Sequence, residues 1–429
     1  MMKRILLTAG LLSAVAMQAG ATGYEQSIEW SGRYGSTAGI GVNAAGAEAL
    51  YFNPAGLAKG SMGSEVSLNL SPQFPQSQGP YTTDNENLSS NTPMGTTGSL
   101  LYNYNITPDL GVGIGAYVGA GVDANFDNVM YTGYTLNTKL HNSVADEEIA
   151  LGVGYQIIPG LKIGAALRAS WVSAEVAGSS VSALPVVAGG GSMLIYTDHQ
   201  GLSDRQIGAY NAGVQYAPSK DWGLGLDYRS KVDFFAKGTT NAQNQIINNG
   251  GGFNGTGNLG TASSTTVSSS LPELWTLGGF YNLSDTWHIM AEADMASYSQ
   301  DQRITISGSL TLPGPLGSKP IPVIQQSNND QYTYRVGAEY SGWSWPVRFG
   351  LIYQSIMENS DFSNPATFAP GHNMTVTLGT GHKVMDALTI DGGLAYSSDT
   401  ADIGAGVASK AGSYSTKDLA FHLGATYAF

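Results

Sequence analysis

Apolar and polar side chains alternate along the last residues of the chain. One set is apolar and comprises Leu419, Phe421, Leu423, Ala425, Tyr427 and Phe429, and the residues between them are small or polar. Successive side chains of a β-strand point to opposite faces, so this segment predicts a strand with one apolar face. A membrane-spanning strand needs about 9–11 residues with such a repeat of two. The segment therefore predicts a strand that crosses a membrane.

The same alternation recurs through most of the chain. We expect strands at 64–74, 97–107, 110–120, 146–157, 161–176, 205–217, 222–237, 270–282, 286–298, 330–341, 346–356, 372–384, 388–398 and 417–429. An even number of strands is the rule for single-chain bacterial barrels. Ending the last strand on an aromatic residue resembles the assembly signal of bacterial outer-membrane barrels. The pattern predicts an all-β protein, a 14-stranded antiparallel transmembrane β-barrel.

Two segments show the alternation most clearly. The first has Ile149, Leu151, Val153, Tyr155 and Ile157, and the second has Leu161, Ile163, Ala165, Leu167, Ala169 and Trp171. We expect each set to face lipid. Tyr and Trp near the ends of such sets are typical of the aromatic girdles at the membrane surfaces.

The connections between the expected strands have two lengths. Six are short and rich in turn-forming residues: 108–109, 158–160, 218–221, 283–285, 342–345 and 385–387. The other seven are longer, and include 75–96, 177–204, 238–269, 299–329 and 399–416. Six short turns and seven long loops fit fourteen strands whose two chain ends are both periplasmic.

The amino terminus has the features of an export signal. Lys3 and Arg4 precede an apolar stretch from Ile5 to Met17, and Ala19-Gly20-Ala21 matches the small-residue cleavage rule. We expect residues 1–21 to be a signal peptide. The alternative is an uncleaved membrane anchor, but the apolar stretch is short for a membrane span.

Composition favours a barrel over a soluble enzyme. Charged residues make up only 12% of the chain, against about 25% in ordinary soluble domains. The net charge is −13, and removal of Lys3 and Arg4 makes it −15, which argues against a nucleic-acid partner. The chain has no cysteine, so it has no disulfide framework or thiolate chemistry. No linker divides 61–429, which we expect to be one barrel.

Residues 22–60 do not alternate like a strand, and they contain Tyr51-Phe52-Asn53-Pro54-Ala55-Gly56-Leu57. This segment resembles the amino-terminal hatch of the FadL family, whose members are outer-membrane channels for long-chain fatty acids and other hydrophobic compounds. Asn53, Pro54 and Ala55 match the hatch motif of that family. The alternative for the tripeptide alone is an ordinary proline turn after a short helix.

Further segments are similar to the same family in the same order. They are Asp227 to Val232, Leu271 to Leu274, Arg335 to Tyr340 and Arg348 to Gly350. The resemblance implies a hatch at 22–60 that plugs the barrel lumen. It also implies passive uptake of hydrophobic compounds such as long-chain fatty acids, through capture at the extracellular loops, passage into a pocket and rearrangement of the hatch.

The resemblance implies, too, that solute leaves sideways through a gap made by a kink in the third strand. Gly119 and Gly121 are the candidates for that kink, because glycine permits bulges and bends. The alternative is that these glycines are only small lumen-facing residues beside the hatch.

A fatty acid would bring a carboxylate into the lumen. The repeat of two places Arg168, Arg229, Lys231, Arg335 and Arg348 on the lumen side, and each is a candidate contact for the head group. The alternative is pairing with the lumen carboxylates Asp227, Glu292, Asp294 and Glu339. We favour pairing for any single arginine.

Two of the expected loops differ in character. The loop 177–204 contains Val181, Leu184, Val186, Val187, Met193, Leu194 and Ile195, which form either a binding groove or the loop's own core. The loop 238–269 is rich in Asn, Gly, Ser and Thr, with only three bulky apolar residues in its middle.

Other functions find little support in the chain. It has none of the common hydrolase or nucleotide-binding motifs, and its six histidines lack metal-ligand spacing, so we expect no enzyme activity, cofactor or metal. A lipid hydrolase using His422 and a serine is the enzyme alternative. The remaining alternatives are a channel for aromatic or aliphatic hydrocarbons and a general diffusion porin. We expect a monomer in the lipid of the bacterial outer membrane, because a closed barrel has no free edge.

Overall fold

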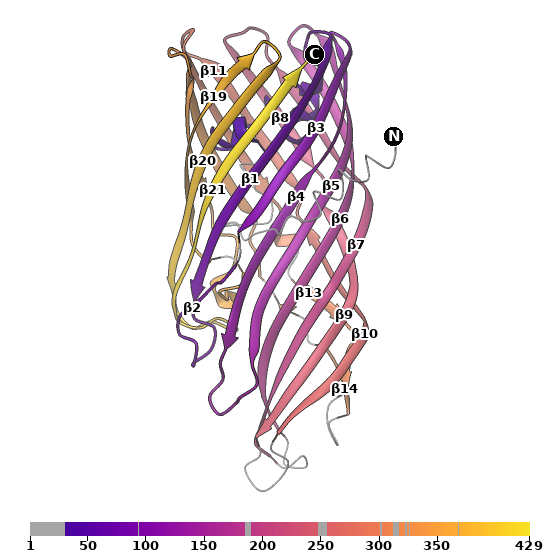
Figure 1. Cartoon of the computed structure of the whole chain (residues 1–429), viewed down its shortest axis with the longest axis vertical. Coiled ribbons are helices and arrows are strands. Elements are labelled where there is room, and N and C mark those ends of the chain that lie inside the picture. The colour runs from indigo at the N-terminus through magenta and orange to yellow at the C-terminus, as the bar shows by residue number, and fades with distance from the viewer. Residues whose placement is uncertain are drawn as a thin grey trace.

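The computed structural model describes residues 31–92, 94–184, 190–247, 255–300, 303–311, 317–321, 324–325, 327–367 and 369–429. The expected signal peptide and its cleavage site lie outside these residues. The chain forms a tall cylinder of tilted strands (Figure 1). Among the described residues, no helix has both the length and the apolar character that crossing a membrane requires.

Fourteen antiparallel strand positions form the ring, and two of these positions are each formed by two consecutive strands. In chain order the strands are β1 (Gly63–Gly79), β3 (Gly95–Thr107), β4 (Leu110–Val129), β5 (Thr138–Ile158), β6 (Leu161–Ala183), β7 (Ser192–Tyr216), β8 (Trp222–Arg229) with β9 (Val232–Ile247), β10 (Gly255–Leu271) with β11 (Leu274–Asn282), β12 (Trp287–Ala296), β17 (Gln331–Tyr340), β18 (Val347–Gln354), β19 (Asn373–Met385), β20 (Leu388–Ile403) and β21 (Gly412–Ala428). Pairing of β1 with β21 closes the ring. The predicted fold class is confirmed.

Short elements fill the long loops. They are β2 (Leu88–Ser89), η4 (Tyr298–Gln300), β13 (Arg303–Ser307), β14 (Ser309–Thr311), β15 (Ser318–Pro320), β16 (Ile324–Gln325) and η6 (Ser360–Phe362). The short turns and the C-terminus share one end of the cylinder, which is the upper end in Figure 1. Short turns are periplasmic in barrels of this type, so the long loops are at the extracellular end.

The two faces of each strand differ as the alternation predicts. On β1, Leu68 and Leu70 are exposed on the outer wall, whereas Ser67 and Asn69 are buried in the lumen. All five residues predicted to face lipid between 149 and 157 are exposed. An apolar exterior and a polar interior are the arrangement that lipid outside and a filled lumen inside require.

Several strands continue well beyond the expected boundaries. Most of 177–204 and 238–269 is strand rather than loop, because β6, β7, β9 and β10 extend toward the extracellular end. Above the membrane the outer face need not be apolar, so Ser, Thr and Asn occupy it and the sequence reads as a loop. The expected strand 222–237 is also interrupted, between Arg229 and Val232.

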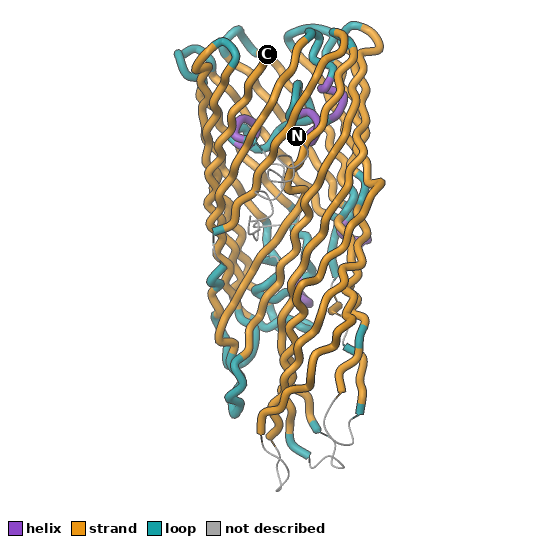
Figure 2. The backbone as a smooth tube through the Cα atoms, turned by 45° about the vertical axis from the view of Figure 1, so that its right-hand side comes forward, coloured by secondary structure: helices purple, strands orange, loops and turns teal. Residues whose placement is uncertain are grey.

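Residues 31–60 lie inside the ring, and we call them the hatch (Figure 2). The hatch contains the short helices α2 (Gly32–Gly35) and α3 (Ala49–Phe52) and the 3-10 helix η2 (Pro54–Leu57). Its apolar side chains pack with Leu101, Tyr117, Ala150 and Ala166 of the wall. A second, larger apolar cluster fills the lumen toward the extracellular end and includes Phe126, Val172, Phe234 and Ile306.

Candidate functional site

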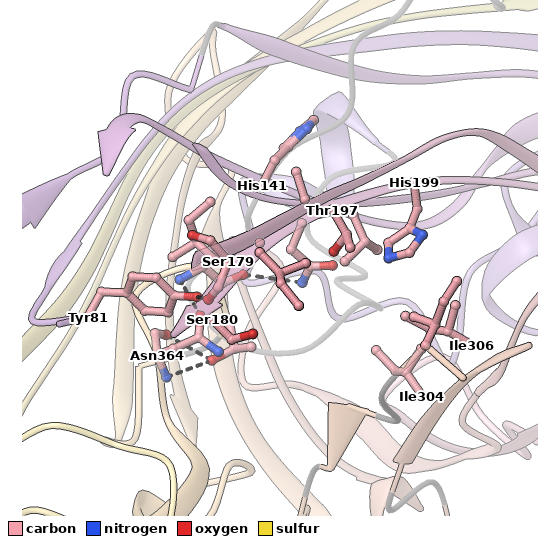
Figure 3. Close-up of a pocket in the computed structure, with 18 of the residues that line it drawn as sticks. Tyr81, His141, Ser179, Ser180, Thr197, His199, Ile304, Ile306 and Asn364 are labelled. Atoms are coloured by element: carbon pink, nitrogen blue, oxygen red, sulfur yellow. Dashed lines mark hydrogen bonds between the residues drawn. The ribbon is translucent and has the colours of Figure 1, made fainter. Parts of the chain in front are cut away.

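A cavity of about 430 Å³ lies in the extracellular half of the lumen (Figure 3). Strands β5, β6 and β7 supply one wall through Leu140, Val176 and Ile195, and Ile304 and Ile306 lie across the cavity from His199. Ligand pockets are typically apolar cavities of about 300–1,000 Å³ with a few polar groups. This cavity is the strongest binding-site candidate among the described residues.

The polar groups of the cavity are neutral side chains and two histidines. His141 Nε2 lies 2.9 Å from Asp123 Oδ1, and His199 Nδ1 lies 2.6 Å from Thr240 Oγ1. No lysine or arginine is among the described residues that line the cavity. The cavity therefore suits an apolar solute, and it offers hydrogen bonds rather than a fixed positive charge.

Residues 303–311 and 317–321 fold back into the lumen and complete the cavity. Their side chains Ile304, Ile306, Leu310 and Ile321 are buried in the extracellular apolar cluster. These residues lie in the predicted long loop 299–329, for which no role was predicted. The alternation of Ile304 and Ile306 was the signal that could have identified it.

The apolar residues of 177–204 are divided between two sites. Leu184 and Met193 form a small cluster with Ile246 of β9, and Ile195 packs against it. Ile195 also lines the large cavity. Of the two interpretations left open, the loop's own core describes Leu184 and Met193, and a binding groove stays a prediction. Val186 and Val187 lie outside the described residues.

Asn53 joins the hatch to the barrel wall. Its Nδ2 lies 2.9 Å from the carbonyl oxygen of Val42 and 3.2 Å from those of Val214 and Leu226. Its Oδ1 accepts a hydrogen bond from the backbone N–H of Ala55, which caps η2. Pro54 occupies the first turn of η2, where its missing N–H has no consequence.

Glycines of β5 and β6 allow the motif to touch the wall backbone. A Cβ on Gly164 would lie 2.2 Å from the backbone N of Ala55, and one on Gly154 would lie 2.7 Å from the carbonyl oxygen of Pro54. No real side chain tolerates such distances. The hatch motif therefore lies directly on the wall at these two glycines.

The third barrel strand, β4, has an irregularity at a predicted position. The β4–β5 register shifts between Val118 and Ala120, so Gly119 is an extra residue in the ladder. The β3–β4 ladder ends at the pair of Ser99 and Tyr117, although β4 continues to Val129. Gly121 stays in the regular ladder opposite Ala145. Of the two candidates, Gly119 is the one in the bulge.

Buried ion pairs lie in the lumen behind Gly119. Glu148 accepts hydrogen bonds from Arg168 at 2.5 Å and from Arg229 at 2.8 Å, and all three side chains are buried. The carboxylate oxygens of Asp146 are buried beside this cluster. Arg168 also donates to the carbonyl oxygen of Ser230.

Two other predicted head-group candidates are also in ion pairs. Arg335 pairs with Asp294 at 2.7 Å and, at 3.7 Å, with Glu292, while its Nη1 donates to the carbonyl oxygen of Ala38 in the hatch. Arg348 pairs with Glu339 and Asp391. Neither lines the large cavity. Contact with a ligand head group stays a prediction for all four arginines.

Lys231 lies on the outer wall, so its predicted lumen position is wrong. It pairs with Asp233 at 3.0 Å, and about half of each side chain is exposed. The break between β8 and β9 adds one residue to the alternation, so Val232 rather than Lys231 faces the lumen. A one-residue shift moves every following side chain to the opposite face.

His422 has a serine partner but no access for a substrate. His422 Nδ1 lies 2.9 Å from Ser71 Oγ, and both residues are fully buried. The other ring nitrogen, Nε2, has no hydrogen-bond partner among the described residues. A hydrolase needs a third group to orient the histidine and an open approach to the serine.

Two further cavities lie on the periplasmic side of the hatch. One, of about 230 Å³, separates Arg33 and Tyr34 of the hatch from strands β11, β12, β17 and β18. The other, of about 510 Å³, lies at the short-turn end beside Lys220 and Glu339. The hatch thus separates these two cavities from the large apolar cavity on the extracellular side.

Comparison with known proteins gives sequence relatives and structural neighbours. A long-chain fatty acid transport protein of Escherichia coli O157:H7 is 25% identical over 201 residues, 45% of each chain. That of Escherichia coli O6:H1 is 29% identical over 150 residues, 34% of this chain and 32% of the relative. These alignments span less than half the length of the curated relatives.

The structural neighbours share the whole fold. The crystal structure of a Pseudomonas aeruginosa FadL homologue matches with a TM-score of 0.70 and 15% identity, over 96% of this chain and 99% of that one. The toluene transporter TodX of Pseudomonas putida matches with a TM-score of 0.71 and 15% identity, over the same shares.

The sequence profile of outer membrane protein transport proteins (OMPP1/FadL/TodX) matches residues 10–427, nearly the whole chain. The ring, the hatch inside it and the apolar cavity are consistent with that match. The chain therefore belongs to the OMPP1/FadL/TodX family of outer membrane transport proteins.

Proposed function

We propose that this protein is a channel for passive uptake of hydrophobic compounds, including long-chain fatty acids, across the bacterial outer membrane. The observation that carries the proposal is the apolar cavity of about 430 Å³, held inside a barrel whose periplasmic side is filled by the hatch. A water-filled pore does not dissolve apolar molecules, whereas an apolar cavity offers them a favourable environment.

We propose that solute leaves sideways, through the wall between β3 and β4. Support comes from the end of the β3–β4 ladder at Tyr117 and from the bulge at Gly119. Transfer from an apolar cavity into lipid is a partition step that needs no energy source. The hatch would change shape to let solute reach this gap.

Neutral hydrocarbons, aromatic or aliphatic, are the second candidate substrate class. The described lining of the cavity lacks lysine and arginine, and the lumen arginines are already paired with carboxylates. A fatty-acid carboxylate buried without a positive partner would be strongly disfavoured. A toluene-like solute needs no such partner.

Uptake of radiolabelled palmitate and of radiolabelled toluene tests the proposal, in cells with and without the protein. Filling the cavity with Ala366→Trp should lower uptake of the true substrate, because Ala366 is buried and lines the cavity. Ala291→Trp is the matched control, since Ala291 is exposed on the outer wall of β12. Equal uptake of both compounds with and without the protein would contradict the proposal.

A general diffusion porin is distinguished by conductance. The proposal predicts little steady ion current in planar bilayers, because the hatch fills the lumen. It also predicts that deleting residues 22–60 raises the current and abolishes selective uptake while the barrel still assembles. A large, steady current from the intact protein would favour the porin.

A further inference from the structure

The barrel wall has a second interruption, between β7 and the strand position shared by β8 and β9. The nearest ladder pairs on its two sides are Ser203 with Lys237 and Asn211 with Arg229. Eight residues separate the flanking positions on each strand, so the two ladders are in the same register. Between them, residues 204–210 and 230–236 form no ladder pairs with each other, although the structure describes all of 190–247 and each stretch stays paired with its other neighbour, β6 or β10. We call these two stretches the seam.

Only a few hydrogen bonds span the seam. At its membrane end, the backbone N–H of Ser230 donates to the carbonyl oxygen of Tyr210 at 2.9 Å, and Ser230 Oγ accepts from the N–H of Tyr210 at 2.9 Å. Farther out, Asp204 Oδ2 accepts from the N–H of Phe235 at 2.7 Å. A side-chain carboxylate thus replaces a ladder bond, and separating the strands here breaks few bonds.

The backbone of β7 is irregular at the same place. Gly208 has φ of +113°, a conformation that side chains rarely adopt, and a Cβ there would meet no atom within 4 Å. The β6–β7 register shifts beside it. The neighbouring Ile207 is 79% exposed. Its side chain lies on the outer wall, as do the other exposed apolar residues of the barrel.

The seam lies at the level where the outer leaflet meets water. Tyr210, Tyr228 and Trp275 form a row of ring contacts on the outer wall at its membrane end, as expected of an aromatic girdle. Beyond them the exposed side chains become charged, including Lys231 and Lys237. A solute leaving through the seam would enter the outer leaflet.

Apolar side chains connect the inner side of the seam to the large cavity. Val232 and Phe234 of β9 belong to the extracellular apolar cluster. A small cavity of about 10 Å³ touches Phe234 and shares Val176 and Ile304 with the lining of the large cavity. Phe234 therefore belongs both to the seam and to the lining of a small cavity beside the large one.

The β4 gap differs in its inner lining. A Cβ on Gly119 would lie 2.8 Å from the carboxyl carbon of Glu148 and 2.9 Å from a carboxylate oxygen of Asp146. A neutral apolar solute that passes there must displace charged groups from their partners. At the seam Arg168 binds Ser230 at the membrane end, and beyond Ser230 the solute meets Val232 and Phe234.

We propose that the seam is a second lateral opening, which passes neutral hydrophobic compounds between the cavity and the outer leaflet. The inference rests on the proposed uptake of hydrophobic compounds and adds a route and a substrate class to it. Asp204 holds the seam closed at its extracellular part, and Phe234 covers it from inside. Opening requires loss of the bond from Phe235 N–H and rotation of the Phe234 ring.

Cross-linking tests the proposal directly, because the chain has no native cysteine. Ile207→Cys with Asp233→Cys places two thiols opposite each other across the seam on the outer wall. Val214→Cys with Leu226→Cys is the control, since these exposed residues form a pair in the intact β7–β8 ladder. A short bis-thiol reagent closes each pair, mass spectrometry verifies closure, and toluene and palmitate uptake are measured.

Closure of the seam should lower toluene uptake by about tenfold, equivalent to ~1.4 kcal/mol, with no such loss in the control pair or before cross-linking. Asp204→Ala should raise toluene uptake. Toluene uptake unaffected by closure, in a protein that transports it before cross-linking, would overturn the seam and leave the proposed function intact. An equal loss of palmitate uptake would overturn the selectivity for neutral compounds. No protein-dependent uptake of either compound, before cross-linking, would instead overturn the proposed function.

Discussion

Replacing Asn53 with alanine should release the hatch from the wall. Of the hydrogen bonds that its side chain makes, those with Val42 and Ala55 lie within the hatch, and only those to the carbonyl oxygens of Val214 and Leu226 reach the wall. The amide has two hydrogens for three carbonyl oxygens, so the substitution removes about one hydrogen bond to the wall, about 1 kcal/mol net. The undocked population of the hatch should therefore rise by roughly fivefold.

Planar-bilayer recording measures this population, because an undocked hatch no longer blocks ions. N53A should show frequent current openings that are rare in the parent protein, and limited proteolysis should cut the hatch faster. Asn43→Ala is the control, since Asn43 is also in the hatch and its side-chain oxygen has no hydrogen-bond partner in the part of the chain that the structure describes. If N53A and N43A give the same open fraction, Asn53 does not hold the hatch and the reasoning is wrong.

Three further substitutions test other contacts. Glu148→Gln leaves two buried guanidinium groups without their carboxylate, so unfolding in detergent should show a loss of about 3–5 kcal/mol, with Glu147→Gln near neutral. Gly164→Ala should undock the hatch without weakening the barrel, seen as bilayer current with an unchanged melting temperature, whereas Gly392→Ala has room for its methyl group and should do neither. Burial raises the pKa of Glu48 in the hatch, and this effect outweighs the hydrogen bonds to its carboxylate, which lower the pKa. The docked hatch therefore favours the neutral form of Glu48. The hatch should be most protected from proteolysis at a pH below the ordinary carboxyl pKa. Its protection should fall as the pH rises through the raised pKa. Glu48→Gln should remove that dependence.

The fold could be predicted because lipid imposes a repeat of two on every strand within the membrane. Outside the membrane that constraint is absent, and there the predicted strand boundaries were wrong. The extracellular parts of β9 and β10 have small polar outer faces, and they read as a loop. Lys231 was predicted on the wrong face because the break between β8 and β9 adds one residue, and the order of apolar and polar residues does not show that break.

The site was harder to predict than the fold. The Asn53-Pro54-Ala55 motif could be identified as part of a hatch, but its contact with Gly164 brings together segments far apart in the chain. The inward fold of 303–311 and 317–321 depends on apolar partners contributed by several strands, such as Leu140. No local pattern specifies such partners, so the cavity emerged only from the three-dimensional structure.

The placement of the hatch has a consequence for how it can move. Glycine contacts fix it against β5 and β6 on one side, and α2 lies against β20 and β21 on the other. The described free volume beside it lies toward β11, β12, β17 and β18. A shift in that direction moves Arg33 and Tyr34 into free volume, whereas Ala38 is held by Arg335 of β17 and lies against Gly350 of β18. We therefore expect the hatch to pivot about Ala38 rather than leave the barrel, so that ions stay blocked while the route for hydrophobic solute changes.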